Sequence, residues 1–164
     1  MKNKALITNS FHMQIILLLI CGILPNMAGF INLPTIWGFK IHFFQVFIFI
    51  AAAATGSAGG LLAGGMGSIF SSIVMNNPYI IFGNMILGTV TGFLVKCGWP
   101  LPLAVLAGFL VQIPWLVITD VYLIGMPLFI VKKLLLSLLI SNLLWSVTAM
   151  VGIKYLKANK LWTK

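Results

Sequence analysis

Long apolar segments, separated by short breaks rich in Gly, Pro, Asn or Lys, run through almost the whole chain. Hydrophobic residues make up 61% of the sequence and charged residues only 7%, which is far from the composition of a soluble domain. The 164 residues leave room for about six helical spans of roughly 20 residues with short links. We therefore expect an all-α integral membrane protein in which residues 1–164 form a single transmembrane domain.

The breaks divide the chain into six expected spans. Their approximate limits are 11–30, 41–55, 60–75, 79–95, 101–118 and 128–153. Residues 31–40 and 119–127 are expected to form loops. Asn76, Asn77 and Pro78 predict a turn, because Asn tolerates left-handed backbone conformations and Pro cannot continue a helix. Pro114 should kink the fifth span and free backbone carbonyls at that depth.

The lysines indicate which side of the membrane each end of a span faces. The chain has ten Lys, no Arg and one acidic residue, Asp120. With six spans and both termini in the cytoplasm, seven lysines fall inside, and three, Lys40, Lys132 and Lys133, fall outside. A five-span alternative, with the second and third spans merged, would place the basic C-terminal tail outside. The positive-inside rule therefore favours six spans, in a multi-pass protein of the cytoplasmic membrane with both termini cytoplasmic.

The stretch from Ala51 to Gly67 joins the second and third spans through glycine, alanine and serine. We expect a tight inner turn at residues 55–60. Gly56, Gly60 and Gly64 repeat every four residues and share one helical face, where another backbone could approach closely. Two interpretations stay open. The three glycines pack against another helix of this chain, which we favour, or they form a smooth docking surface for a partner protein.

Polar residues in or near the expected spans converge on the outer side. Polar groups in hydrocarbon are costly unless they face a cavity or a partner, so they are candidate substrate-binding residues. The candidates are His42, Gln45, Asn76, Asn77, Tyr79, Asn84, Gln112, Trp115, Asp120, Lys132 and Lys133. Several have a plainer alternative: the lysines can snorkel to headgroups, His42 can contact headgroups, and Gln45, Asn84 and Gln112 can form hydrogen bonds between helices. Their convergence favours an outward-facing polar pocket.

Catalysis and metal binding are not expected. One carboxylate cannot supply paired-acid hydrolysis, a carboxylate metal cage or a carboxylate proton relay. The serines of the third span lack a nucleophile-elbow pattern, and Cys21 and Cys97 have no metal-ligand spacing. The lysines form no patch with interleaved aromatic residues, which argues against nucleic acid as a partner. We expect no enzyme activity, no cofactor and no bound metal.

Six short spans with both ends inside, a glycine-rich turn and an outer cluster of amides and aromatics resemble the substrate-binding S component of energy-coupling factor (ECF) transporters. The resemblance covers most of the chain from IHFFQVFIFIAAAATGSAGGLLAGGMGSIF through NNPYIIFGNMILGTVTGFL to TDVYLIGMP. It implies a protein that binds a vitamin or precursor in an outer pocket and docks on a transmembrane coupling subunit driven by a pair of ATPase subunits. The metal-ion branch of the family resembles chains that begin with a Met-His motif, whereas this one begins Met1-Lys2-Asn3.

The sequence therefore predicts a membrane-embedded S component that captures a small organic nutrient. Three outer lysines against one acid favour an anionic substrate. Two alternatives stay open: a stand-alone small transporter or channel-forming protein, and a structural membrane subunit without a ligand. The first of these would be favoured by an internal repeat, and the first three spans show no clear pairing with the last three.

Overall fold

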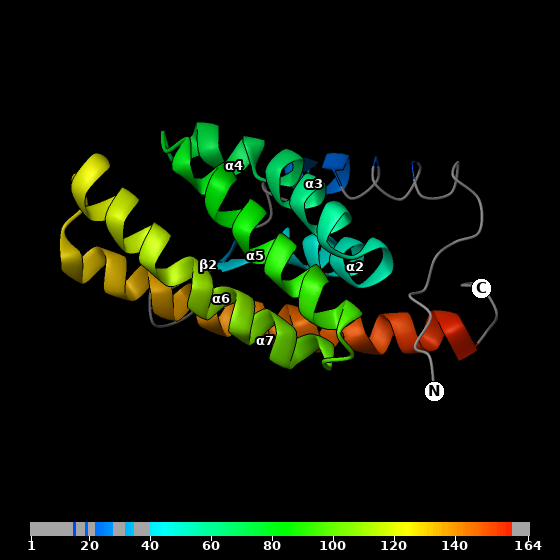
Figure 1. Ribbon diagram of the computed structural model, residues 1–164. Helices are drawn as coiled ribbons and strands as arrows, with labels where there is room; N and C mark the ends of the chain where they lie inside the picture. The colour runs from blue at the N-terminus through cyan, green and yellow to red at the C-terminus, as the bar shows by residue number, and fades with distance from the viewer. Residues whose placement is uncertain (1–14, 16–18, 20–21, 28–31, 35–39, 159–164) are drawn as a thin grey trace.

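The computed structural model describes residues 15, 19, 22–27, 32–34 and 40–158. The expected first span, 11–30, lies largely outside these residues, although 22–27 are helical. The described elements are, in order, β1 (Asn32–Pro34), β2 (Lys40–His42), α2 (Gln45–Thr55), α3 (Ser57–Gly67), α4 (Ile69–Val74), α5 (Tyr79–Lys96), α6 (Leu101–Val117), η1 (Ile118–Leu123) and α7 (Leu128–Ala158) (Figure 1).

Four helical stretches in the described part of the chain are long and apolar enough to cross a membrane. They are Ser57–Val74, Tyr79–Lys96, Leu101–Leu123 and Leu128–Tyr155. The helix α2 is equally apolar in character but has only 11 residues. The expectation of a helical, membrane-compatible chain is thus confirmed for this part of the sequence.

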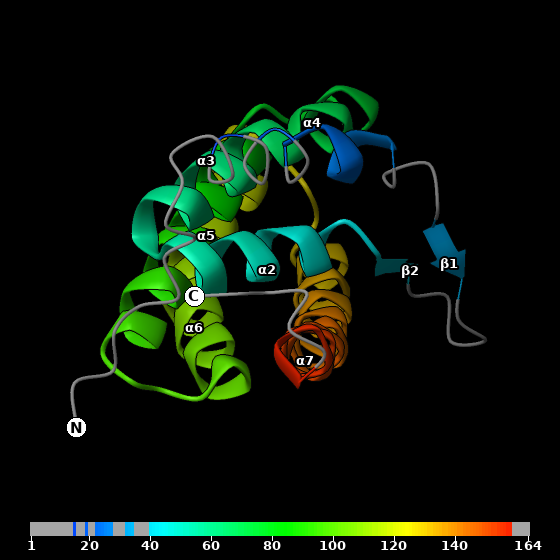
Figure 2. The ribbon, with the colours of Figure 1, turned by 90° about the vertical axis from the view of Figure 1, so that its right-hand side faces the viewer.

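The helix α2 lies in the middle of the assembly, between α7 and the pair formed by α3 and α5 (Figure 2). Its side chains Ile48 and Phe49 are fully buried, and they join Leu87 of α5 and Val105 of α6 in the largest apolar cluster. The hydrophobic faces of four helices therefore meet around α2, while many large apolar side chains on the outer surfaces of the long helices stay exposed. This distribution suits a lipid environment, where apolar surface has no reason to be buried.

The glycine repeat packs within the chain, against α5. A Cβ atom added at Gly60 would overlap the carbonyl of Gly88, and one added at Gly64 would overlap the carbonyl of Asn84. Gly92 meets Gly56 in the same way. Since these glycines are buried against a neighbouring helix, they are not open to a partner, and the docking interpretation of Gly56, Gly60 and Gly64 gives way to intramolecular packing.

The turn before α3 is shorter than expected, and the helix that follows it has a break that was not expected. The turn before it is a single residue, Gly56, whose positive φ of 78° a glycine adopts without strain, so that α3 begins at Ser57 and the expected turn over 55–60 is wrong. At its other end the helix breaks at Ser68 before α4 begins. Asn26 bridges this break, because its Nδ2 donates to the carbonyl of Met66 at 2.7 Å and its Oδ1 accepts from the amide of Phe70 at 2.8 Å.

Part of the expected loop 31–40 forms strand instead. β1 pairs with β2 in antiparallel register, with Asn32 opposite His42 and Pro34 opposite Lys40. The two segments alternate polar and apolar residues, but over three residues this period-two signal is too short to recognise in a sequence. The hairpin is a small addition to an otherwise helical structure, and it leads directly into α2 through the turn at Phe43 and Phe44.

The expected outer loop 119–127 is also wrong in its first half, because the chain stays helical to Leu123. After Pro114, which lacks an N–H, α6 continues and then widens into the π-helix η1. Wider turns bring two consecutive residues, Thr119 and Asp120, to the buried side, where they are 2% and 1% exposed. The chain leaves the helix near Gly125, which has a φ of 77°.

Candidate functional site

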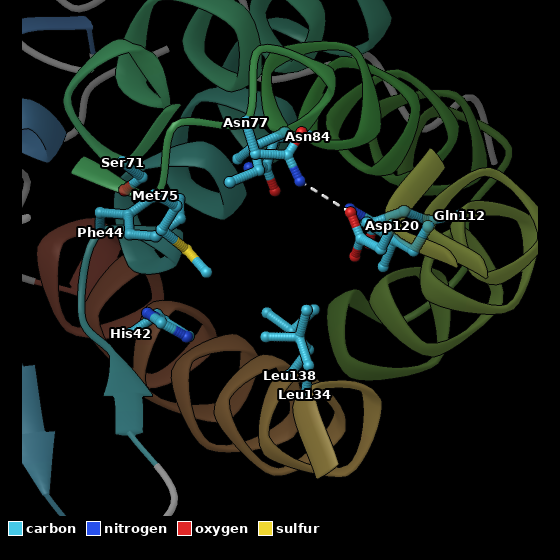
Figure 3. Close-up of a pocket in the computed structure, with 12 residues that line it drawn as sticks. His42, Phe44, Ser71, Met75, Asn77, Asn84, Gln112, Asp120, Leu134 and Leu138 are labelled. Carbon is cyan, nitrogen blue, oxygen red and sulfur yellow. Dashed lines mark hydrogen bonds between the residues drawn. The ribbon is translucent and has the colours of Figure 1, made fainter. Parts of the chain in front are cut away.

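A small cavity lies at the end of the bundle where β2, the turn between α4 and α5, η1 and the first half of α7 meet. Its volume is about 40 Å³, which is room for about three water molecules. Figure 3 shows the polar wall formed by Asn77, Asn84, Gln112 and Asp120, with His42 on the opposite side. Five of the eleven residues expected to bind substrate line this cavity, and they come from five separate elements or turns.

Asp120 and Asn77 form a hydrogen-bonded pair of buried side chains at the cavity. The Nδ2 of Asn77 donates to Oδ1 of Asp120 at 2.7 Å, and both side chains are 1% exposed. The Oδ1 of Asn77 accepts from the backbone N–H of Tyr79 at 3.0 Å, which fixes the amide at the start of α5. One side chain thereby ties the turn between α4 and α5 to η1, and it holds the carboxylate of Asp120 in place at the cavity.

Asn84 and Gln112 contribute carboxamides from the facing sides of α5 and α6. Both are buried, at 5% and 3% exposure. The Oε1 of Gln112 is buried without a hydrogen-bond partner in the described structure. Since buried polar atoms in proteins are nearly always bonded, an unpaired acceptor beside a cavity marks a place where a donor from a ligand would be stabilised.

The remaining lining residues were missed by the sequence reasoning, which considered polar and aromatic side chains one at a time. They are Phe44, Ser71, Met75, Ile80, Leu116, Leu134 and Leu138. Helical spacing offers a signal that finds two of them, since Ile80 lies four residues before Asn84 and Leu116 lies midway between Gln112 and Asp120. The helical faces that carry the polar residues of the cavity therefore also supply apolar residues to its wall.

The aromatic candidates Trp115 and Tyr79 lie outside the lining of the cavity. Trp115 Nε1–H donates to the backbone carbonyl of Tyr79 at 3.1 Å, and their ring centroids are 6.5 Å apart at an angle of 65°. Phe82 packs on the same indole with a centroid distance of 6.0 Å. These contacts join α5 to α6, so Trp115 and Tyr79, expected as substrate-binding residues, pack the two helices together instead.

The other four candidates do not line the cavity either. Asn76 is exposed in the turn, with a φ of 48°. Lys132 and Lys133 are exposed on α7, and the ammonium of Lys133 lies 6.0 Å from the ring centroid of Phe129. Their exposure is compatible with the snorkelling alternative, and the ionisable side chains that line the cavity in the described structure are His42 and Asp120. The expectation of an anionic substrate rested on the outer lysines, and no lysine is among the residues that line the cavity in the described structure.

Gln45, the last candidate, does not line the cavity either and is buried in α2. Just before α2, the backbone N–H of His42 donates to Ser141 Oγ of α7 at 3.2 Å, and the ring of Phe43 lies 4.7 Å from that of Trp145. The side-chain amides of Gln45 in α2 and Asn142 in α7 are both buried, and none of their four polar atoms has a partner in the described structure. The Nε1 of Trp145 is unpaired as well.

Metal-binding clusters are absent from the part of the chain that the structure describes: it holds no group of three or more His, Cys, Asp or Glu side chains able to hold an ion. Comparisons of the chain with protein-family models, with curated proteins and with solved structures found no match. The function is therefore argued from the cavity and from the arrangement of the helices.

Proposed function

We propose that this chain is the membrane-embedded substrate-binding subunit of an importer of the ECF type, an S component, and that the cavity captures a small organic nutrient. In this proposal the chain hydrolyses nothing itself. A transmembrane coupling subunit and a pair of ATPase subunits supply the energy for transport. The observation that carries the proposal is the cavity, whose polar wall is assembled from four separate segments at one end of the bundle.

The proposed topology has six spans, with both termini in the cytoplasm and the cavity toward the outside. Lys96 lies at the end of α5, beside Gly56 in the turn between α2 and α3, and this end of the bundle is far along the helix from Asn84. Lys154 near the end of α7 adds a further positive charge. The positive-inside rule supports a cytoplasmic location for this end and an outer location for the cavity.

The size of the cavity limits what it can hold without rearrangement. Sites for drug-sized ligands measure roughly 300–1,000 Å³, whereas this cavity measures about 40 Å³. A compact group fits directly. A larger nutrient requires flexible wall residues to move, and Met75, with its unbranched side chain, is the residue best suited to do so.

The two other functions are disfavoured by specific features. A structural subunit without a ligand would not need the unpaired Oε1 of Gln112 at a cavity, since a hydrophobic side chain would pack there at lower cost. A channel would need a continuous polar path, and the helices beyond the cavity meet in an apolar cluster that includes Ile48, Leu87 and Val105. The unpaired oxygen supports a binding site, and the apolar cluster supports a closed site in preference to a pore.

Copurification tests the proposal. The tagged chain, extracted from its native membrane in mild detergent, should bring down one further integral membrane protein and two ATPase subunits that bind ATP. A matched extraction with an unrelated tagged membrane protein controls for adventitious capture. Recovery of the chain without any ATPase, from membranes in which its own genomic neighbours are expressed, would contradict the assignment as an S component.

A further inference from the structure

Asp120 is a buried acidic side chain, and in the part of the cavity wall that the structure describes the other ionisable side chain is His42. Asp120 is the only acidic residue of the chain and is 1% exposed. In the part of the chain that the structure describes, its side-chain hydrogen bond is the one from Asn77, a neutral amide. The two lysines nearest in sequence, Lys132 and Lys133, are exposed on α7 and do not line the cavity.

A buried charge of this kind is costly unless a partner compensates it. Removing one ion from water costs several kcal/mol in real proteins, and the cost is largest where the surroundings are hydrocarbon. Natural chains therefore retain an intramembrane carboxylate where it faces a cavity or a ligand of opposite charge. Asp120 lines the cavity, so a cation placed there would relieve the cost.

The neighbouring groups are acceptors suited to N–H donors. Gln112 presents a buried, unpaired Oε1, and Asn84 presents a carboxamide to the same cavity. A primary ammonium carries three N–H donors and one positive charge. It can therefore bond the carboxylate of Asp120 and the oxygen of Gln112 at once, which a neutral alcohol with one donor cannot do.

The other side of the cavity fits a short carbon chain. Phe44, Met75 and Leu138 line it, and they offer apolar contact to methylene groups (Figure 3). His42 lies on the same side, and a bare inorganic cation would gain nothing from the three apolar side chains. The volume of about 40 Å³ limits the bound part of the ligand to an ammonium group with few carbon atoms.

We infer that the cavity recognises the primary ammonium group of its ligand, with Asp120 as the charge partner and Gln112 as a second acceptor. This inference rests on the proposed function, because it names the substrate class of the same site. It replaces the anionic substrate that the outer lysines favoured. The ligand is then an amine, or a larger molecule that inserts an aminoalkyl group.

A matched series of three probes tests the inference on the purified full chain in detergent. Propylammonium, propanol and propionate have the same length and differ in charge and donor number. Propylammonium should raise the thermal unfolding midpoint in a saturable way, because it binds the folded state, while propanol and propionate should not. A shift with propionate or propanol, or no shift with propylammonium up to molar concentration, would overturn the inference.

Asp120→Asn provides the specific control, since it removes the charge and keeps the size of the side chain. We expect its affinity for propylammonium to fall at least about tenfold, with the unfolding midpoint in buffer unchanged or higher. Thr148→Ala, an exposed position of α7 far along the helix from the cavity, should bind as the unchanged protein does. Equal binding by Asp120→Asn would refute the role of Asp120. A larger midpoint shift with sodium ion than with propylammonium would refute recognition of the ammonium group.

The outcome separates this inference from the proposed function. If ATPase subunits copurify and the bound solute is neutral or anionic, the S-component proposal stands and the ammonium inference fails. If propylammonium binds through Asp120 and no ATPase copurifies, the inference stands and the S-component proposal fails.

Discussion

Buried polar residues of this chain fall into two groups with opposite energetic consequences. Both polar atoms of the Asn77 side chain are hydrogen-bonded, since Nδ2 donates to Asp120 and Oδ1 accepts from the backbone N–H of Tyr79. Gln45 and Asn142 are buried with both polar atoms of each amide unpaired in the described structure. A paired amide stabilises the fold by a modest amount, whereas an unpaired one costs its full desolvation energy. The same residue type thus supports the structure at one place and strains it at another.

Substitution should reveal this difference directly. We expect Gln45→Met and Asn142→Leu each to leave the free energy of unfolding unchanged or to raise it by about 1–2 kcal/mol, because they remove an unpaired amide at similar volume. Asn77→Leu should lower it by about 2–3 kcal/mol, because it removes a hydrogen bond to a carboxylate. Denaturant titration of the three variants measures these changes. Equal destabilisation by all three would show that Gln45 and Asn142 are bonded in the folded protein.

The sequence could predict the presence of a polar site but only half of its members. Its strongest signal was the depth of each polar residue along a helix, which predicted a cluster at one end of the bundle. Five of the predicted residues line the cavity there: His42, Asn77, Asn84, Gln112 and Asp120. It could not give the direction in which a side chain points. Three candidates have the right depth but do not line the cavity: Lys132 is exposed on α7, Trp115 bonds to the backbone of α5, and Gln45 is buried elsewhere in α2. Rotation about the helix axis is set by packing, which depth does not determine.

Among the elements, the pair α3 and α5 is held by backbone contact. Gly60 and Gly88 face each other so closely that neither has room for a Cβ, and Gly56 with Gly92 repeats the contact one turn away. In lipid, where apolar burial does not drive helices together, such close packing is a main source of association. The four-residue repeat was readable in the sequence, and the partner helix was not, because either α5 or another protein could have supplied the second surface.

Two single substitutions, Gly88→Ala on α5 and Gly152→Ala on α7, test this packing. Gly88→Ala should lower the free energy of unfolding by at least about 2 kcal/mol, because its methyl group would overlap the carbonyl of Gly60. Gly152→Ala on α7 is the matched control, since a Cβ there meets nothing within 4 Å, and it should stabilise by about 0.5–1 kcal/mol through helix propensity. Thermal unfolding of both variants is the measurement. Similar stability changes for Gly88→Ala and Gly152→Ala would contradict the close contact.

Helix limits were predictable where Gly, Pro or Asn marked them and failed elsewhere. The Asn76–Pro78 turn and the start of α6 after Pro100 follow the sequence signals. The extension of α6 into η1 does not, because TDVYL has no helical pattern of its own and becomes helical through the turns that precede it. The hairpin of β1 and β2 was also hidden, since three-residue strands gain their stability from pairing and not from local preference.

At the scale of the whole molecule, the bundle has a basic end, with Lys96 and Lys154, and an opposite end that holds the polar cavity. In the proposed topology the basic end faces the cytoplasm. Cys97, at the end of α5, provides a natural reporter of this orientation because it is exposed and unpaired. In a Cys21→Ser background, a membrane-impermeant thiol reagent should label Cys97 in inside-out vesicles and spare it in intact cells. Labelling of Cys97 in intact cells would invert the topology and place the cavity on the wrong side for uptake.

The central claim is that the cavity holds the ligand, and direct detection of the ligand tests it best. Native mass spectrometry of the full chain, released from mild detergent, should detect a copurified small molecule. Asn84→Ala and Gln112→Ala should each reduce its occupancy by about tenfold or more without loss of folded protein, because each removes a polar contact in the cavity. The control Thr148→Ala should keep it. Unchanged occupancy in both cavity variants would contradict the account.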